Sequence, residues 1–434
     1  MIGRAGAPGR QGSLAPAGDG SEGRHGAGDE GHVLWRVRTF AEIARGARRG
    51  PTVVVAIVAA ALLTLGISDR SRAAPPLQAV PVYREFGDWI VGCDETRRCM
   101  AKLAPDDDRS APLDQAHLTI WMDPGPQAEP ELVFGAAPPD DDARGIALLP
   151  LRLRLDGVAL PSDAAWEDAG SGEIRLRGEA ARALLGRVRD GSAVTVAPAD
   201  GHGATLSLQG LAATLLLVDA VQGRVGTVSA LGQPGPGSAA GLAPPVLEPV
   251  LRAAPVPPPL VGGADLVRTV ARIAAPARRA AGCDTAGNGD ASWAQPLTGA
   301  EALVALACDS GAYQTGFLLF RVPRNRPAGA VPLRLPVPPL AGLGSDTDGG
   351  GTLMGASFDP ARGVLSSRSV GRGLGDCGEQ LDWVFDGRRF QLAFRAAQER
   401  CGGNTAEWPI LLRSLIVAPK AAAPKAAAPG ASAP

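Results

Sequence analysis

The chain has 434 residues, more than one ordinary domain needs. Hydrophobic residues make up 45% of it, which is enough to build cores, so a wholly disordered chain is excluded. The formal net charge of −1 excludes a broad basic surface, and no nucleic-acid partner is expected.

The N-terminal region has the features of an export signal. Residues 52–67 form an apolar run without a charge, arginines lie just before it, and small residues precede a cleavage site after Ala73. This pattern predicts a signal peptide over residues 51–73 and a periplasmic location. The alternative is that residues 52–67 remain as an inner-membrane anchor, although a spanning helix needs about 20 apolar residues. Only a retained anchor would bring membrane contact.

Composition divides the rest of the chain into folded and unfolded parts. Residues 1–50 show no sustained apolar period, which indicates a disordered extension or an initiator Met assigned too far upstream. Residues 233–262 are dense in Pro, Gly and Ala and predict a linker. The Ala/Pro repeat at 419–434 predicts a disordered tail. Two folded domains are therefore expected, at residues 80–232 and 263–418.

The six cysteines all lie after the export signal, and an even number in an exported chain predicts disulfides. Sequence order suggests the pairs Cys93–Cys99, Cys283–Cys308 and Cys377–Cys401. A redox pair is disfavoured because no C-x-x-C motif occurs. No metal site is expected, because the spacing of the cysteines does not suit tetrahedral zinc. No cofactor is expected either.

In the first folded part, short strands are predicted at residues 118–122 and 131–134. Asp156-Gly157 between two apolar runs predicts a hairpin. Apolar residues with helical spacing at 181–188 and again at 211–218 predict two short helices. The first part is therefore expected to be sheet-rich α+β.

The second folded part opens with an apolar helical face at residues 266–273. Thr298 and Glu301 could form a capping box before the run AEALVALAC, but this run could equally be a buried strand. Asp386-Gly387 predicts a second hairpin. The expected fold class is α+β, with two sheet-rich, disulfide-braced domains joined by the Pro/Gly/Ala-rich linker.

Several stretches of this sequence are similar to one family of exported bacterial proteins. They are FGDWIVGCDETRRCMA (86–101), LSLQGLAATLLLVDAVQGRVGTVSAL (206–231), CDSGAYQTGFLLFRV (308–322), VGRGLGDCGEQLDWVFDGRRFQLA (370–393) and CGGNTAEWPILLR (401–413). The family is called domain of unknown function 1176. The first part also weakly resembles the invasion-associated locus B proteins. The resemblance implies an exported, two-part architecture and assigns no biochemical activity.

The glycine-rich loop at residues 371–378 is one candidate site. A phosphate-binding loop would need a helix after it, whereas a hairpin is expected here. A tight structural loop beside Cys377 is the favoured interpretation. The alternative is a recognition loop that uses Arg372 and Asp376.

The tryptophans near the cysteines are a second candidate. Trp89, Trp383 and Trp408 lie inside the family-like stretches. Packing of their rings against disulfides is the favoured interpretation. The alternative is an aromatic surface that binds a glycan or a peptide.

The sequence contains few residues of the types that usually carry out catalysis. No G-x-S-x-G motif follows the signal, and only His117 and His202 lie beyond it. His117 is interpreted as a structural residue and His202 as part of an exposed turn. Paired carboxylates need no histidine, so a carboxylate-dependent hydrolase is not excluded.

The sequence therefore favours a non-catalytic periplasmic protein that binds a ligand or maintains the envelope. Its expected partner is an envelope protein or a glycan. The alternative is a carboxylate-dependent cell-wall hydrolase. No catalytic residue is assigned.

Overall fold

The computed structural model describes residues 77–104, 116–135, 148–161, 165–170, 172–198, 203–283, 291–343, 351–403 and 407–418. The predicted export signal, N-terminal extension and C-terminal tail lie outside these residues, as does His202. Within the described ranges, no helix is long and apolar enough to cross a bilayer.

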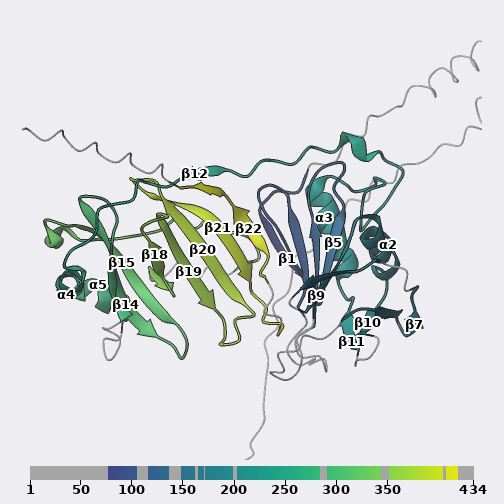
Figure 1. Cartoon of the computed structure of the whole chain (residues 1–434), viewed down its shortest axis with the longest axis horizontal. Coiled ribbons are helices and arrows are strands. Elements are labelled where there is room, and N and C mark those ends of the chain that lie inside the picture. Colours follow the sequence, from purple (N-terminus) through teal and green to yellow (C-terminus); the bar gives the residue numbers. More distant parts are fainter. Residues whose placement is uncertain are drawn as a thin grey trace, which may run out of the picture. The chain divides into compact units, whose positions relative to one another are not determined.

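The described chain is mostly β, with few helices and several antiparallel sheets. Helices therefore contribute less than the α+β expectation suggested. Figure 1 shows these elements, coloured along the sequence from purple to yellow.

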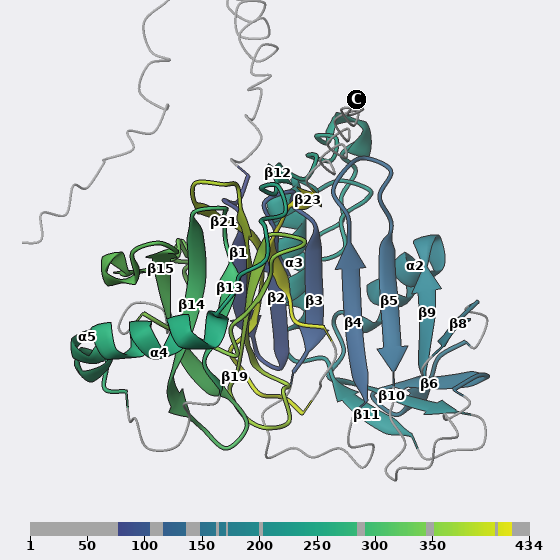
Figure 2. The same ribbon diagram turned by 60° about the vertical axis from the view of Figure 1, so that its left-hand side comes forward.

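The first half is built on a seven-stranded antiparallel sheet with the order β1-β2-β3-β4-β5-β9-β8. Most of these strands lie beside their sequence neighbours, because short turns favour antiparallel pairing of consecutive strands. Figure 2 shows β1 to β5 and β9 side by side. The strands are β1 (Val82–Phe86), β2 (Trp89–Cys93), β3 (Cys99–Leu103), β4 (His117–Met122), β5 (Pro130–Gly135), β8 (Glu167–Gly170) and β9 (Glu173–Arg177).

One face of this sheet is covered by two helices, α2 (Gly178–Val188) and α3 (Leu211–Gln222). Alternate residues of β4, such as Leu118 and Ile120, point into the core beneath them. A four-stranded sheet contributes to the same core: β6 (Leu151–Leu155), β7 (Val158–Ala159), β10 (Ala193–Pro198) and β11 (Ala204–Ser207). Both predicted helices are thus present.

The Pro-rich segment 233–262 is mostly exposed but is not without structure. It contains a short 3-10 turn, η1 (Ala239–Gly241), and the strand β12 (Val250–Arg252). β12 pairs in parallel with β23 (Leu415–Val417), near the end of the described chain. Composition did not predict this strand, because its backbone hydrogen bonds depend on a partner far away in the sequence.

The second half contains two five-stranded sheets that share a core. The first consists of β13 (Trp293–Pro296), β14 (Glu301–Ser310), β15 (Thr315–Pro323), β16 (Val331–Pro332) and β17 (Thr352–Met354). The second consists of β18 (Ser357–Asp359), β19 (Val364–Val370), β20 (Gly378–Phe385), β21 (Phe390–Gln398) and β22 (Ile410–Arg413). The described part of this half also contains three short helical elements: α4 (Gly263–Ile273), α5 (Ala275–Ala280) and η3 (Pro327–Gly329).

The ambiguous run after Thr298 is strand β14. Its alternate residues reach two different cores: Leu303 faces the second five-stranded sheet, whereas Val304 faces α4. A strand buried on both faces has apolar residues at every position, so its sequence does not alternate. The Thr298 hydroxyl accepts hydrogen bonds from the amides of Ala300 and Glu301, which caps a turn before a strand and not a helix.

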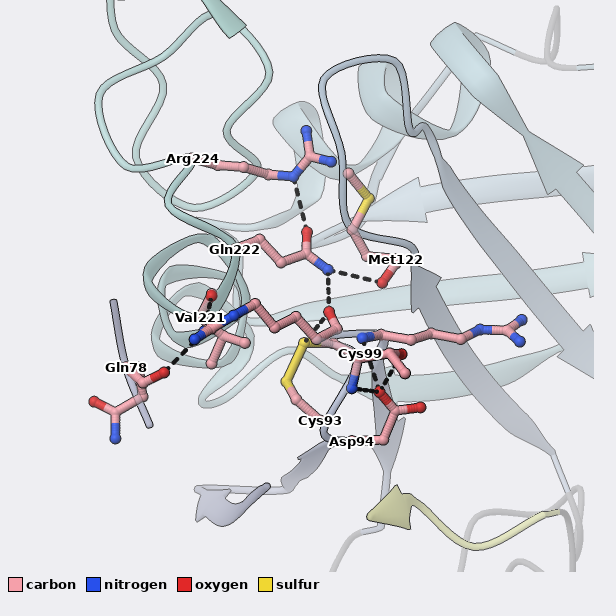
Figure 3. The surroundings of a disulfide bond; sticks show 11 residues. Gln78, Cys93, Asp94, Cys99, Met122, Val221, Gln222 and Arg224 are labelled. Carbon is pink, nitrogen blue, oxygen red and sulfur yellow. Dashed lines mark hydrogen bonds between the residues drawn. A yellow bond between two sulfur atoms is a disulfide. The ribbon is translucent and has the colours of Figure 1, made fainter. Parts of the chain in front are cut away.

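The structure contains the three disulfides that sequence order suggested, namely Cys93–Cys99, Cys283–Cys308 and Cys377–Cys401. Cys93 and Cys99 lie directly opposite each other on β2 and β3. Figure 3 shows the polar contacts beside this bond, where the Gln222 amide of α3 donates to the carbonyl oxygens of Arg97 and Met122. The disulfide, the turn and the end of α3 therefore support one another.

Candidate functional site

The face of the seven-stranded sheet that points away from α2 and α3 carries a polar hollow of about 350 Å³. Its lining comes from alternate residues of neighbouring strands, which lie on one face because side chains alternate along a strand. The lining residues are Arg98, Met100, His117, Thr119, Trp121, Glu131, Val133, Glu173, Arg175, Glu407 and Arg413. We call this hollow the outer-face groove.

One end of the groove is formed by His117 on β4 and Glu173 on β9. Their side chains meet with 3.2 Å between Nε2 and Oε1, although β5 runs between the two strands. This contact is possible because Gly135 of β5 has no side chain. A Cβ atom at Gly135 would lie only 2.1 Å from Cε1 of His117. The glycine therefore lets the imidazole cross over β5 to the carboxylate.

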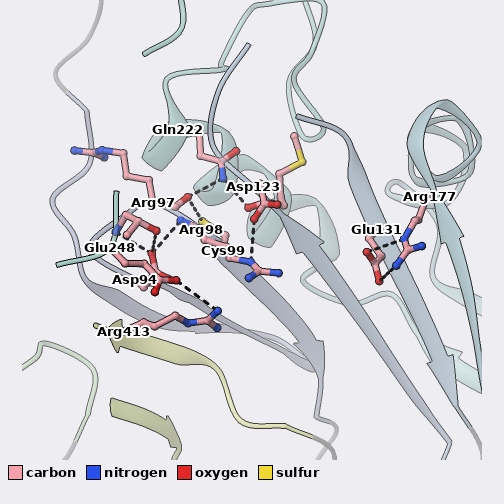
Figure 4. Close-up of polar contacts among 12 residues, drawn as sticks. Asp94, Arg97, Arg98, Cys99, Asp123, Glu131, Arg177, Gln222, Glu248 and Arg413 are labelled. Atoms are coloured by element: carbon pink, nitrogen blue, oxygen red, sulfur yellow. Dashed lines mark hydrogen bonds and ion pairs between the residues drawn. The ribbon is translucent and has the colours of Figure 1, made fainter. Parts of the chain in front are cut away.

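Two lining residues of the groove, Glu131 on β5 and Arg175 on β9, belong to an ion-pair network with Arg177. Nε of Arg175 lies 2.7 Å from one carboxylate oxygen of Glu131, and Nε of Arg177 lies 3.0 Å from the other. Figure 4 shows the contact with Arg177. Hydrogen bonding to Glu131 raises the pKa of the Arg177 guanidinium. Both carboxylate oxygens are thus held in place by cations.

The other end of the groove contains an aromatic ring. The guanidinium of Arg98 lies 4.9 Å from the ring centroid of Trp121. Nε of Arg98 also contacts Asp123 at 2.9 Å (Figure 4). Trp121 is half-buried. A ring whose orientation is set by a stacked cation offers a flat apolar surface beside polar groups.

Two residues from the second half of the chain complete the lining. Arg413 is the last residue of β22; its side chain approaches Glu248 with 3.9 Å between nitrogen and oxygen, and its backbone amide donates to Glu95. Glu407 contributes its carbonyl oxygen to Lys102, 3.4 Å from Nζ. Lys102 is fully buried on β3, and this burial lowers its pKa to about 7, although Asp376 and Glu407 oppose the shift.

The groove can bind a polar ligand by several kinds of interaction. Its arginines can donate to carboxylate or phosphate oxygens, its carboxylates can accept from hydroxyl or ammonium groups, and Trp121 can stack on a flat apolar surface. Its volume lies within the range of small-molecule sites.

The described residues offer few side chains that could together bind a metal ion. The one cluster of potential ligand atoms combines Asp376 with Cys377 and Cys401. The two sulfur atoms are joined in a disulfide and do not offer thiolates. That cluster is therefore not a metal site of the ordinary kind.

The hypothesis of an aromatic surface at Trp89, Trp383 and Trp408 is wrong. Trp89 and Trp383 are 0% exposed and Trp408 is 4% exposed. The indole nitrogens of Trp89 and Trp383 donate to the carbonyl oxygens of Ser207 and Pro336, so these rings belong to packed cores. Trp121 is half-buried and lines the outer-face groove, and the sequence did not single it out.

Arg372 and Asp376 do lie together, but they contact each other. The guanidinium donates to both carboxylate oxygens, at 2.8 and 2.6 Å, and the amide of Gly403 donates to the same carboxylate. These hydrogen bonds lower the pKa of Asp376 although its burial opposes the shift. Asp376 is fully buried, so this pair shapes the loop instead of presenting a carboxylate to solvent.

His117 was interpreted as structural, and it does have an ion-pair partner. Its position in the groove was missed, because the groove draws its residues from segments more than 50 positions apart. One signal was present in the sequence. Between the core residues Ile120 and Met122, a strand of alternating pattern places the bulky Trp121 on the opposite face.

The fold and the groove define a mostly β, disulfide-containing protein with a charged hollow on one sheet face. Residues 83–414 match the family described as "Protein of unknown function (DUF1176)", and the chain belongs to this family. It is similar to the uncharacterized protein YpfG of Escherichia coli strain K12, with 30% identity over 354 residues, or 77% of this chain and 93% of the relative. No solved structure matches the chain.

Proposed function

We propose that this protein is a non-catalytic binding protein of the bacterial periplasm and that the outer-face groove holds a charged glycan fragment. The predicted export signal and the three disulfides support an oxidising compartment. Two disulfide-braced α+β domains, at residues 80–232 and 263–418, are part of this proposal.

The observation that carries the proposal is the composition of the groove. A half-buried ring at Trp121 lies in one hollow with the ion pairs of Glu131 with Arg175 and of His117 with Glu173. Sugar rings present an apolar face to aromatic residues, while charged planar side chains bind their hydroxyl and acidic groups. A fragment of cell-wall glycan that carries a short peptide offers all these groups.

The ion pairs favour binding over hydrolysis. A glycosidase needs one carboxyl group that can deliver a proton to the glycosidic oxygen and a second one on the opposite side of the bond. In the groove, the carboxylate of Glu131 is held by two arginines and that of Glu173 by His117. Such contacts fix the carboxylates as parts of a preorganised polar surface.

Calorimetric titration of the purified chain with disaccharide-peptide released from bacterial cell wall tests the proposal. We expect one saturable site, with affinity at least 10-fold weaker in Trp121→Ala and in Arg175→Gln. Arg187→Gln, an exposed arginine on α2 outside the groove, is the matched control and should bind as the unchanged chain does. Absence of binding, or equal affinity in all variants, would contradict the proposal.

The same preparations test the hydrolase alternative. Release of soluble fragments from purified cell wall by the unchanged chain, lost in Glu131→Gln, would identify a carboxylate-dependent hydrolase and overturn the non-catalytic interpretation. We expect no such release.

A further inference from the structure

A second polar cavity, of about 460 Å³, lies beside the Cys377–Cys401 disulfide. Strands β17, β19, β20 and β21 supply most of its walls. Its lining residues are Thr352, Leu353, Met354, Ser367, Ser369, Gly371, Cys377, Gly378, Glu379, Leu381, Ala397, Gln398, Glu399 and Cys401. We call it the disulfide cavity. It shares no lining residue with the outer-face groove.

Gln398 provides the central observation. Its side chain is fully buried, and its amide nitrogen donates to the carbonyl oxygens of Asp376 and Arg400, at 2.7 and 2.9 Å. These two bonds use both amide hydrogens and fix the orientation of the group, because a flipped amide would place its oxygen against two other acceptors. Among the described residues, no donor reaches the Oε1 atom of Gln398. A buried acceptor is therefore held at the cavity wall in a fixed position.

The surroundings of this acceptor are acidic. Glu379 and Glu399 line the cavity, and none of its described lining residues is Lys, Arg or His. Arg395 lies outside the lining and contacts the carboxylate of Glu379, with Nε and an outer nitrogen each 2.8 Å from Oε1. The disulfide cavity thus offers acceptors and negative charge.

The loop at residues 371–378 holds the acceptor in position. The ion pair of Arg372 with Asp376 closes the loop, and the carbonyl oxygen of Asp376 then accepts from Gln398. Gly371 allows the loop to approach the disulfide, since a Cβ at that residue would lie 2.8 Å from Sγ of Cys377. The family-like glycine-rich stretch therefore shapes the cavity wall.

We propose that the disulfide cavity binds a small ligand through a primary alkylammonium group. An ammonium group carries three hydrogen-bond donors and no acceptor, so it complements the Gln398 oxygen and the two carboxylates. A carboxylate or phosphate ligand would meet like charge here. The volume fits a short-chain amine.

Three probes of equal chain length test the inference: 1,4-diaminobutane, butane-1,4-diol and succinate. Calorimetry on the oxidised full chain should show one site per chain for the diamine. Binding should be at least 10-fold weaker for the diol and absent for succinate. Equal weak binding of the diamine and the diol, or binding of succinate, would overturn the ammonium assignment and leave a cavity filled by water.

Two variants locate the diamine. Glu399→Gln keeps the side-chain shape and removes a charge, so affinity should fall at least 10-fold. Gln398→Met removes the acceptor and should have a similar effect; because it also removes the two loop contacts, its thermal unfolding is measured in parallel. Glu179→Gln, an exposed acidic residue on α2, is the control for non-specific charge effects. Unchanged diamine affinity in a folded Glu399→Gln variant would contradict the inference.

Amine binding in the disulfide cavity and glycan binding in the outer-face groove can be tested independently. Trp121→Ala and Arg175→Gln alter the outer-face groove and should leave diamine binding unchanged. Loss of glycan binding with retained diamine binding would therefore remove only the proposed function.

Discussion

At the scale of single residues, Gly135 matters because it has no side chain. It gives His117 room to reach Glu173 across β5, and an added methyl group would collide with the imidazole ring. Gly135→Ala should break this ion pair and destabilise the protein by about 1–3 kcal/mol, the usual cost of an overpacked site. Urea unfolding measures the loss, and the imidazole NMR signals report the broken pair.

Gly186→Ala is the matched control for this prediction. Gly186 lies exposed within α2, with no atom within 4 Å of an added Cβ. Replacement should therefore stabilise the helix, by up to about 1 kcal/mol. Equal effects of the two substitutions would show that crowding at His117 is not the cause.

Lys102 makes the folding stability depend on pH. Burial lowers its folded-state pKa to about 7 from an ordinary 10.5. Between these two pH values, Lys102 carries a proton in the unfolded chain and lacks it in the folded chain. The free energy of unfolding therefore rises with pH, by at most about 1.4 kcal/mol per pH unit. Below pH 7 this gain is absent and the buried charge is fully unfavourable.

Lys102→Met removes this term. Between pH 7.5 and 9.5, the unfolding free energy of the unchanged chain should rise relative to the variant, by about 2 kcal/mol, in paired urea titrations. A difference between the two proteins that stays constant with pH would contradict a lowered lysine pKa.

At the scale of secondary-structure elements, periodicity predicted the helices but not the groove. Residues 181–188 form one face of α2 because their apolar side chains cover a single core. β14 was ambiguous because two cores bury its opposite faces. The pairing of β4 with β5 and of β5 with β9 places Trp121, Glu131 and Glu173 on one surface. The register of these pairs cannot be predicted from the sequence of each strand alone.

The disulfides differ in the length of chain that they close. Cys377 and Cys401 are separated by 24 positions, whereas Cys93 and Cys99 are separated by 6. Loop entropy then predicts a cost of about 3.5 kcal/mol for replacing the first pair with alanine and about 2.4 kcal/mol for the second. Urea unfolding of the two double variants should preserve this order; a larger loss for Cys93/Cys99 would show that local packing outweighs loop entropy.

At the scale of the whole molecule, the described residues belong to one compact unit, and polar contacts join its first and second halves. Arg400, just after β21, binds the Glu85 carboxylate at 2.6 Å and donates to the carbonyl oxygens of Gly87 and Ala104. Tyr83 accepts from the amide of Glu399, and its burial raises the pKa of its hydroxyl. The first and second halves therefore stabilise each other through polar contacts as well as apolar ones.

Arg400→Met should weaken this contact and retain most of the side-chain volume. We expect the free energy of unfolding to fall by about 1–3 kcal/mol, because charge-assisted hydrogen bonds are lost while Glu85 remains. Arg362→Met, an exposed arginine outside this contact, should change it by no more than about 0.5 kcal/mol. Equal stability of both variants would argue against a structural role for Arg400.

The imidazole of His117 lines the outer-face groove and therefore reports directly on whether this groove is a ligand site. The measurement is an NMR titration of the histidine ring nitrogens with the disaccharide-peptide, assigned with a His117→Gln variant. We predict a saturable shift of the His117 signals with the same dissociation constant as calorimetry. Saturable ligand binding that leaves the His117 signals unmoved would contradict the claim and place the ligand elsewhere.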